Sequence, residues 1–374
     1  RGEVPFVEPG FDALLEKVVE DGLLVAQSEQ APADAYIVCV PTPFAEGHKV
    51  DTKYIDAASE ALAPHLSAGA LVVLESTSPP GTTRHMAERL IELRPDLSID
   101  EDDDNAIFVA HCPERVLPGR IMEEMESNDR VIGGLTPQGT RLAVELYSTF
   151  CTAELLETDA TTAEMAKLTE NSFRDVNIAF ANELSLICDD LGINVWELIE
   201  LANHHPRVNI LQPGPGVGGH CIAVDPWFIV SSAPKTSRII RTAREVNDSK
   251  PEWVLHKVRQ AIGSRSNVVV SALGIAFKND IDDLRESPSL EIVRRLAEEC
   301  PTIDIRVVEP NVTELPVSLR GFGNLQKEDL EPAVAAADIV LLLVNHTEFV
   351  KMDRDLLKDK VVIDTKGVWG SQML

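Results

Sequence analysis

The sequence predicts an α/β protein with two open, parallel sheets joined by a long helix. Short apolar runs alternate with helical segments over the first part of the chain, and the alternation resumes after residue 267. Between these regions, residues 161–191 show the three- and four-residue apolar spacing of a single amphipathic helix. Because strands that alternate with helices form parallel β-α-β units, we expect a parallel sheet at each end of the chain.

In the first region, polar residues follow the predicted strands. The strands are expected at 36–40, 70–74 and 107–110, and the helices at 9–20, 56–66 and up to about residue 93. Ligands of parallel sheets bind beyond the carboxyl ends of the strands. The residues at such ends are Thr42, Thr77, Thr83, Glu114 and Arg115.

A dinucleotide-binding sheet normally opens with a strand, a Gly-x-Gly-x-x-Gly turn and a helix. Gly2, Gly10 and Gly22 lack that spacing, and no such element precedes Arg1. Either this region never had the turn or the sequence begins inside the domain, and we favour the second interpretation.

The long helix carries an apolar stripe and a polar face. Its stripe comprises Val176, Ala179, Phe180, Leu184 and Ile187. Lys167, Asn171 and Arg174 stand at i, i+4 and i+7 and therefore share one face, where a lysine and an amide can donate to the same oxygen. The alternative is a solvated polar face without a ligand.

A glycine-rich stretch, 212–228, presents one thiol. It reads Gln-Pro-Gly-Pro-Gly-Val-Gly-Gly-His-Cys-Ile-Ala-Val-Asp-Pro-Trp-Phe. Glycines permit close backbone approach and prolines stiffen the chain, so Cys221 with Asp225 is typical of a covalent site. The alternative is a surface loop with an inert cysteine.

The remaining elements complete the second sheet. Helices are expected at 195–202, at 236–262 with an interruption at Pro251, and at 288–299; strands are expected at 268–273, 305–308, 339–344 and 361–364. His204 and His205 are adjacent and cannot share a helix face, so we expect no metal site there or elsewhere.

The formal net charge of −27 over 374 residues is the unusual feature of the composition. Such an acidic surface repels nucleic acid and anionic membranes, so neither is an expected partner. No run approaches the length of a membrane span, and the six cysteines form no Cys-x-x-Cys pair, so we expect a cytoplasmic protein without a disulfide framework.

Self-repulsion at this charge also predicts a halophilic protein, because salt screens repulsion between like charges. We expect the free energy of unfolding, measured by denaturant titration, to rise as salt increases from low to molar concentration. Full stability and activity in low-salt buffer would contradict this expectation and favour an acidic protein without a salt requirement.

Taken together, the motifs make the chain similar to the UDP-glucose/GDP-mannose dehydrogenase family, over essentially its whole length. The matching stretches are 40–44, 75–79, 112–119, 164–174, 205–209, 213–228 and 277–287. The resemblance implies two Rossmann-like domains, and it implies that the first lacks the N-terminal segment that carries its glycine loop. It places an NAD-binding domain at 1–155, a central helical dimerisation region with the catalytic loop at 156–260, and a UDP-sugar-binding domain at 261–374.

The activity implied is a four-electron oxidation of a UDP-amino sugar at C6 to the carboxylate, with two NAD used in succession. Cys221 would hold the aldehyde as a thiohemiacetal and then as a thioester. Lys167 and Asn171 suit the oxyanion, while Asp225 and Thr77 match the positions that orient water. Glu114 is a further catalytic candidate, but Pro118 replaces a second glutamate of UDP-glucose members, so the hydrolytic base stays open.

The resemblance also implies binding residues and a partner. The nucleotide-sugar candidates are Arg115, Val116, Lys167, Asn171, Arg174, His205, Arg207, Gly218, Phe277 and Lys278, and the NAD candidates are Thr42, Thr83 and Arg285. Arg174 and the 205–209 match favour N-acetylmannosamine as the sugar. A homodimer on the long helix is expected, with the neighbouring subunit completing the substrate site.

Three alternatives to these assignments remain open. Without the context of the motif, Arg285 is expected to form a surface salt bridge with Asp282 or Glu286. A two-electron hydroxyacid-type dehydrogenase shares the Lys-x-x-x-Asn helix and needs no thiol. A non-catalytic nucleotide-sugar-binding protein would bind the sugar without turnover.

Overall fold

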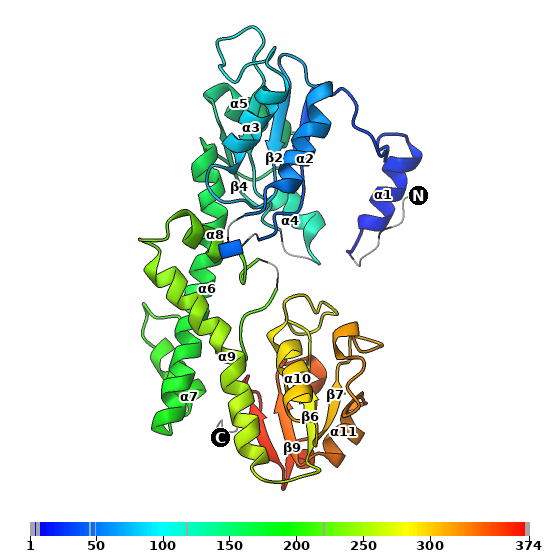
Figure 1. The fold of residues 1–374 in the computed structure, drawn as a ribbon, viewed down its shortest axis with the longest axis vertical. Helices are drawn as coiled ribbons and strands as arrows, with labels where there is room; N and C mark the ends of the chain where they lie inside the picture. Colours follow the sequence, from blue (N-terminus) through cyan, green and yellow to red (C-terminus); the bar gives the residue numbers. More distant parts are fainter. Residues whose placement is uncertain are drawn as a thin grey trace. The chain divides into compact units, whose positions relative to one another are not determined.

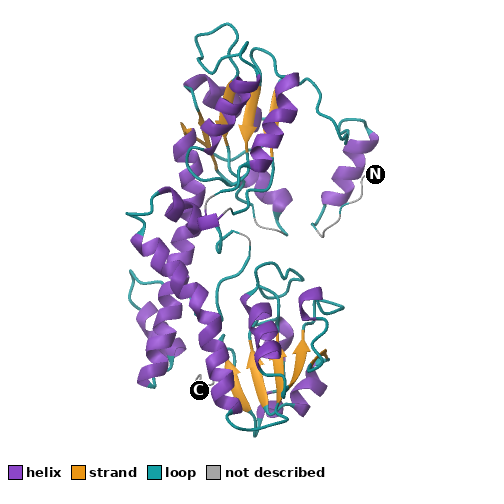
Figure 2. Ribbon diagram, viewed as in Figure 1, coloured by secondary structure: helices purple, strands orange, loops and turns teal. Residues whose placement is uncertain are grey.

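The computed structural model describes residues 4, 8–44, 46–48, 50–116, 119–219 and 221–370. It divides the chain into two compact units, which Figure 1 shows in sequence colours and Figure 2 by element type. The first unit comprises residues 1–170 with 227–234, and the second comprises 171–226 with 235–374. Each unit holds a five-stranded sheet, so the predicted α/β class is confirmed.

The first sheet has the order β1-β2-β3-β4-β5. Its strands are β1 (Ala35–Val38), β2 (Leu71–Leu74), β3 (Phe108–His111), β4 (Arg130–Gly134) and β5 (Leu155–Asp159). The first three strands are parallel, but β4 runs antiparallel to β3, with Ala110 opposite Gly134. The expectation of a purely parallel sheet is therefore wrong at this pair. Among the described residues that connect the two strands, the one helix is the short α4 (Ile121–Ser127).

Side-chain alternation along β2 builds a core on each face of this sheet. Val72 and Leu74 pack with α2 (Lys53–Leu62) and α3 (Thr82–Leu93), whereas Leu71 and Val73 pack with α5 (Pro137–Tyr147). Because successive residues of a strand point to opposite faces, a strand covered on both faces has to be apolar throughout. This explains the unbroken apolar run that identified the strand.

Helix α1 (Phe11–Glu20) confirms the first predicted helix, but it has no buried residue. The 3-10 turns η1 (Glu46–His48) and η2 (Ala63–His65) flank α2. Sequence analysis identified neither β4, α5 nor β5. Strand β4 ends in two glycines, and β5 includes exposed polar residues, so neither has a strong apolar pattern.

Helix α6 (Ala160–Leu191) is the predicted long helix, and its residues from Asn171 onward belong to the second unit. There it is followed by α7 (Val195–Asn203) and α9 (Arg238–Ile262). The predicted interruption at Pro251 is wrong, because α9 continues through it. Proline removes one helical hydrogen bond, but Val254 and Val258 on the following turns are fully buried and hold the helix in place.

The second sheet has the order β10-β9-β6-β7-β8, and all its pairs are parallel. Its strands are β6 (Val269–Leu273), β7 (Asp304–Val308), β8 (Leu325–Lys327), β9 (Ile339–Leu342) and β10 (Val361–Asp364). Helices α9 and α10 (Pro288–Glu299) cover one face, and α11 (Leu330–Ala336) with α12 (Thr347–Lys351) covers the other.

The four strands predicted for this sheet are confirmed. Sequence analysis did not identify β8, α11, α12 or α8 (Asp225–Ser232). Two short 3-10 turns, η3 (Val317–Leu319) and η4 (Arg354–Leu357), complete the described elements.

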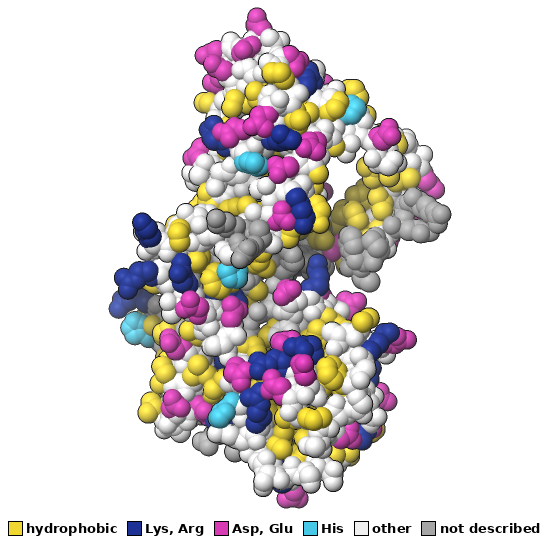
Figure 3. All heavy atoms as spheres, viewed as in Figure 1, with side chains coloured by type: hydrophobic (Ala, Val, Ile, Leu, Met, Phe, Trp, Pro, Cys, Tyr) yellow, Lys and Arg dark blue, Asp and Glu magenta, His cyan; other side chains and the backbone are white. Residues whose placement is uncertain are grey.

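The surface intersperses acidic and basic side chains, as the face in Figure 3 shows. In the second unit, for example, Arg295 pairs with both Glu252 and Glu299. In the described part of the chain, no helix has the length and apolarity needed to cross a membrane.

Candidate active site

Glycines of the 212–228 stretch let the backbone of residues 216–219 pack closely against other residues of the second unit. A Cβ on Gly218 would lie 2.6 Å from the carbonyl oxygen of Glu286 and 2.7 Å from Cδ of Pro288. Gly219 has φ of +83°, and a Cβ there would lie 3.1 Å from the ring of Phe277. Backbone and proline atoms cannot move aside cheaply, so any side chain at Gly218 would displace the loop.

The loop then presents Cys221 at the surface and turns into α8. The Cys221 carbonyl accepts the amides of Val224, at 3.0 Å, and Asp225, at 2.8 Å. Asp225 is 3% exposed, and its carboxylate accepts a hydrogen bond of 2.5 Å from the side-chain amide of Asn171. The structure therefore joins the thiol-bearing turn, the buried acid and the long helix through direct contacts.

Lys167 lies one helical turn before Asn171 on α6 and is half-buried. Residues four apart lie on the same helix face, so the predicted pairing of a lysine and an amide agrees with the helix geometry. Arg174, at i+7, is exposed, as are His205 and Arg207 near the end of α7. The His205 ring accepts the amide of Arg207 at 3.3 Å.

Glu164, three residues before Lys167, attaches α6 to the start of α3 within the first unit. Its carboxylate accepts the amides of Gly81 and Thr83 and the hydroxyl of Thr83, all at 2.6 Å. Burial raises the pKa of Glu164, and these hydrogen bonds act in the opposite direction. Thr83, predicted to contact NAD, is thus fully buried, with its hydroxyl bonded to this carboxylate.

Glu114 and Arg115, after β3, are both held in ion pairs. Glu114 pairs with the buried Arg130 at 3.1 Å, and Arg115 pairs with Glu170 of α6 at 2.7 Å. Val116 is half-buried, while Pro118 lies outside the described residues. The carboxylate of Glu114 therefore has a guanidinium partner within hydrogen-bonding distance.

Arg285 is exposed and forms an ion pair with Asp283 at 2.6 Å, rather than with Asp282 or Glu286. Hydrogen bonding to Asp283 is the largest cause that raises the pKa of Arg285, and a smaller contribution comes from Cys221. The thiol of Cys221 therefore lies within electrostatic range of the Arg285 guanidinium. Phe277 is half-buried and Lys278 is exposed.

Sequence analysis missed three residues that bond to candidate residues or to the segments that carry them. Glu164 lies within the matched stretch 164–174 but was not predicted as a functional residue, because an acid three residues before a lysine is not a distinctive pattern. Tyr147 donates to Glu75 at 2.9 Å, and Arg130 pairs with the same carboxylate at 3.8 Å. Tyr147 belongs to α5 and Arg130 to β4, two elements that the sequence analysis did not identify. Asn182 accepts the amide of Gly214 at 2.9 Å and thereby holds the start of the loop.

Comparison with known families covers three successive parts of the chain. The NAD binding domain of the UDP-glucose/GDP-mannose dehydrogenase family matches residues 1–151, its central domain matches 161–249, and its UDP binding domain matches 271–371. The chain belongs to this family. The resemblance inferred from the motifs is confirmed, and the chain is an NAD-dependent dehydrogenase.

Similar proteins of this family carry two different names. An NDP-N-acetyl-D-galactosaminuronic acid dehydrogenase of Ralstonia solanacearum is 54% identical over all of this chain and 88% of its own length. A UDP-N-acetyl-D-mannosamine dehydrogenase of Escherichia coli (strain K12) is 52% identical over 99% of this chain and 90% of its own.

Solved structures of the family share the fold. The UDP-N-acetyl-mannosamine dehydrogenase of Staphylococcus aureus is 40% identical, with a TM-score of 0.85 over 100% of this chain and 87% of that one. A UDP-D-ManNAc dehydrogenase from Pyrococcus horikoshii is 36% identical, with a TM-score of 0.85 over 98% of this chain and 86% of that one.

The described residues fit a dinucleotide at the carboxyl end of β2. The amides of Ser76, Thr77 and Ser78 make no hydrogen bond to another described residue, and the Thr42 hydroxyl donates to the Thr77 carbonyl at 2.8 Å. Uncommitted amides beyond the ends of parallel strands are suited to the oxygens of a nucleotide. Thr42, which was predicted from the sequence to contact NAD, would hold NAD there.

We predict that Gly218→Ala lowers kcat by about tenfold or more, because the added Cβ displaces the backbone that carries Cys221. Gly323→Ala is the matched control, since a Cβ at Gly323 meets nothing within 4 Å. Steady-state kinetics with NAD and a UDP-sugar check the prediction. Equal kinetics for both variants would show that the packing around Gly218 does not set the position of the thiol.

Proposed function

We propose that this protein oxidises C6 of UDP-N-acetyl-D-mannosamine to the uronate in two steps through covalent catalysis by Cys221. The observation that carries the proposal is the contact of Asn171 with Asp225 at 2.5 Å, four residues beyond an exposed cysteine. A two-electron alcohol dehydrogenase needs no thiol. A cysteine held on a shaped loop beside an acid and an amide therefore supports the four-electron reaction.

In the first oxidation, the residues of α6 position the C6 hydroxyl. Lys167 either accepts the proton of the hydroxyl, if the lysine is neutral, or donates to the oxygen, and Asn171 is a second donor one turn away. NAD, when bound, supplies the hydride acceptor for both oxidations. The product of this step is an aldehyde at C6.

In the second oxidation, the Cys221 thiolate adds to the aldehyde carbon and forms a carbon–sulfur bond. The resulting thiohemiacetal loses the C6 hydride together with its hydroxyl proton and becomes a thioester. Lys167 and Asn171 stabilise the oxyanion that precedes each collapse. Water, oriented by Asp225 and Thr77, then adds to the thioester carbon, and cleavage of the carbon–sulfur bond releases the carboxylate and the thiolate.

The base that accepts the proton of this water is proposed to be Glu114 or Asp225. The carboxylate of Glu114 lies 3.1 Å from the guanidinium of Arg130. Asp225 is buried and bonded to Asn171, so it already has one donor on its carboxylate. On these contacts, we assign Asp225 the orienting role and retain Glu114 as the candidate base.

The substrate side of the proposal rests on cationic side chains and on the two relatives' names. Arg115, Arg174, Arg207 and Lys278 suit the diphosphate, which arginine binds in a bidentate fashion. His205, Val116, Gly218 and Phe277 are proposed to line the rest of the nucleotide-sugar site. Arg285 is proposed to contact NAD on exchange of its Asp283 partner. The two sugars named for the relatives make UDP-N-acetyl-D-galactosamine the competing substrate.

We predict that Cys221→Ser abolishes uronate formation, with a fall in kcat of roughly 10³-fold or more, and leaves UDP-sugar affinity within about twofold. Wild-type protein should produce two NADH per sugar consumed. The measurements are NADH absorbance, product analysis and sugar titration over a panel of UDP-sugars.

One NADH per sugar would favour the hydroxyacid-type mechanism. Binding without turnover, in protein that also binds NAD, would favour a non-catalytic binder. Wild-type turnover by Cys221→Ser would falsify the covalent mechanism. A preference for the galactosamine sugar would overturn the substrate assignment but keep the chemistry.

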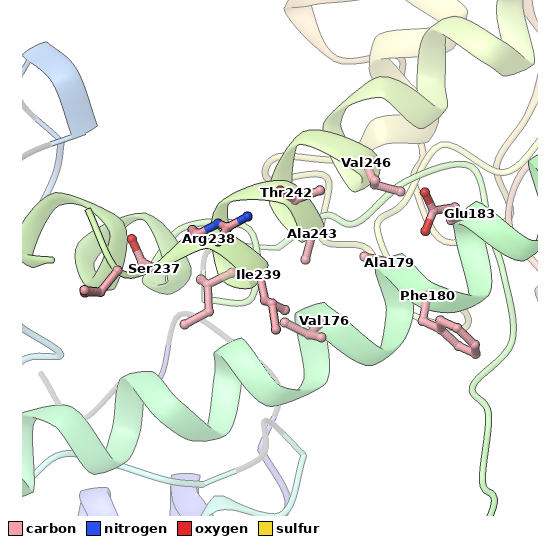
Figure 4. A pocket seen from close by; sticks show the side chains of 12 residues that line it. Val176, Ala179, Phe180, Glu183, Ser237, Arg238, Ile239, Thr242, Ala243 and Val246 are labelled. Atoms are coloured by element: carbon pink, nitrogen blue, oxygen red, sulfur yellow. The ribbon is translucent and has the colours of Figure 1, made fainter. Parts of the chain in front are cut away.

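We further propose a homodimer built on α6, with the neighbouring subunit completing the substrate site. Phe173, Phe180, Ile187 and Leu191 follow one side of α6 and are 69%, 52%, 47% and 67% exposed. Phe180 lines an apolar groove of about 940 Å³ between α6 and α9, together with Val176 and Ile239, the latter 72% exposed (Figure 4). An exposed apolar patch of this extent marks an interaction surface, and a two-fold axis would bring the same patch of a second copy onto it.

We predict that Phe180→Asp converts the dimer to a monomer and reduces turnover at least tenfold, because a charge in the groove prevents apolar contact. Val317→Asp is the control, since Val317 is also apolar, is 80% exposed and does not line the groove. Light scattering coupled to size-exclusion chromatography measures the mass. A Phe180→Asp protein that is still dimeric would place the interface elsewhere.

A further inference from the structure

A chain of buried side chains leads from the α6–α9 contact to the loop that carries Cys221. The Gly214 amide donates to Oδ1 of Asn182 at 2.9 Å, and Nδ2 of Asn182 donates to Oδ1 of Asn247 at 2.8 Å. Nδ2 of Asn247 in turn donates to Asp175 Oδ1 at 2.8 Å, and Arg244 donates to the same oxygen at 2.6 Å. All four side chains are at most 1% exposed.

The direction of this chain is fixed by its two ends. A backbone amide can only donate, so Asn182 has to offer its oxygen to Gly214 and its nitrogen to Asn247. Asn247 then presents its own oxygen to Asn182 and its nitrogen to Asp175, which as a carboxylate only accepts. Hydrogen bonds that run in one direction and end on a charge strengthen one another. Both amide orientations therefore follow from the chemistry of the ends.

The hydrogen bond from the Gly214 amide to Asn182 fixes a part of the loop that has few other hydrogen bonds. Within 211–219, the Gly214 amide is the one backbone group that forms a hydrogen bond to another described residue. The remaining loop is confined by contact of Gly216 with Pro288 and of Gly218 and Gly219 with Phe277. Such contacts limit how closely atoms approach but fix no direction, so the Asn182 bond sets where the loop begins.

We propose that Asn182 is a positioning residue for Cys221, acting through Gly214 and oriented by Asn247 and Asp175. This inference rests on the proposed role of Cys221 as the nucleophile. Without the Asn182 oxygen, the Gly214 amide has no acceptor and the loop leaves its place above Phe277. The backbone that leads to Cys221 is then no longer held, and the thiol loses its place near the guanidinium of Arg285.

The first test is Asn182→Ala, with kinetics and thiol chemistry measured together. We expect kcat to fall about 10- to 100-fold, as for a misplaced reacting group, while KM for NAD stays within about twofold. The rate of Cys221 alkylation by iodoacetamide, measured on its own peptide by mass spectrometry, should reach its midpoint at a higher pH. Asn324→Ala is the control, because Asn324 donates to Ala297 and Cys300 carbonyls away from the loop.

A sharper test reverses the direction of the chain. Asn182→Asp keeps an acceptor for Gly214 but faces the oxygen of Asn247 with a carboxylate, so turnover should fall. When Asp175→Asn is added, the Asn247 amide can rotate, so that it donates to the carboxylate at position 182 and accepts from the amide at position 175. Arg244 keeps its ion pair with Asp248. We expect the double variant to recover at least about fivefold in kcat over the single Asn182→Asp variant.

The outcomes separate this proposal from the proposed function and from a loss of folding. Lowered stability in Asn182→Ala with unchanged kcat and alkylation profile would overturn the proposal, as would no recovery in the double variant. If Asn182→Ala fails to fold, Asn247→Ala takes its place with the same expected shift. If Cys221→Ser retained turnover, the nucleophile assignment would fail, whereas the alkylation profile would still test the positioning of the thiol.

Discussion

The buried contact between α6 and α9 is the interaction on which the rest of the second unit depends. It is polar at its centre: Arg244 pairs with Asp175, and Lys250 donates to Ser185 at 2.6 Å while its ammonium lies 3.8 Å from the ring centre of Trp253. Burial lowers the pKa of Lys250 to about 7, so this contact is costly unless every partner is in place. Such contacts specify one relative placement of two helices better than apolar packing does.

That placement matters because both sides of the helix pair are used. Val176, Phe180 and Ile239 line an apolar groove, whereas the side chain of Asn182 accepts the Gly214 amide of the loop that leads to Cys221. Val176 and Phe180 of α6 thus belong to the surface that we propose for a second copy, and Asn182 of the same helix belongs to the support that we propose for the thiol. A change in the position of either helix would alter both surfaces, since each helix is nearly rigid.

Several features could be predicted from sequence because their signal is local. The cores of both sheets include residues of strands such as 70–74 and 339–344. The apolar runs of these strands are continuous because both faces of each sheet are covered. The thiol loop was recognisable from its glycines, and the structure supplies a contact for each of Gly216, Gly218 and Gly219. Pro251 misled the prediction, because a helix buried by its later turns tolerates a lost hydrogen bond.

The sequence by itself determined the α/β class, the long helix, the family and the candidate residues Lys167, Asn171, Cys221 and Asp225, since periodicity and short motifs are properties of neighbouring residues. Only the tertiary structure decided that β4 turns antiparallel, that Glu164 closes the start of α3, and that Asn182 holds Gly214. The last two contacts join residues 81 and 32 positions apart. Such hydrogen bonds leave no periodic trace in sequence, because their partners meet only after the helices and sheets have packed.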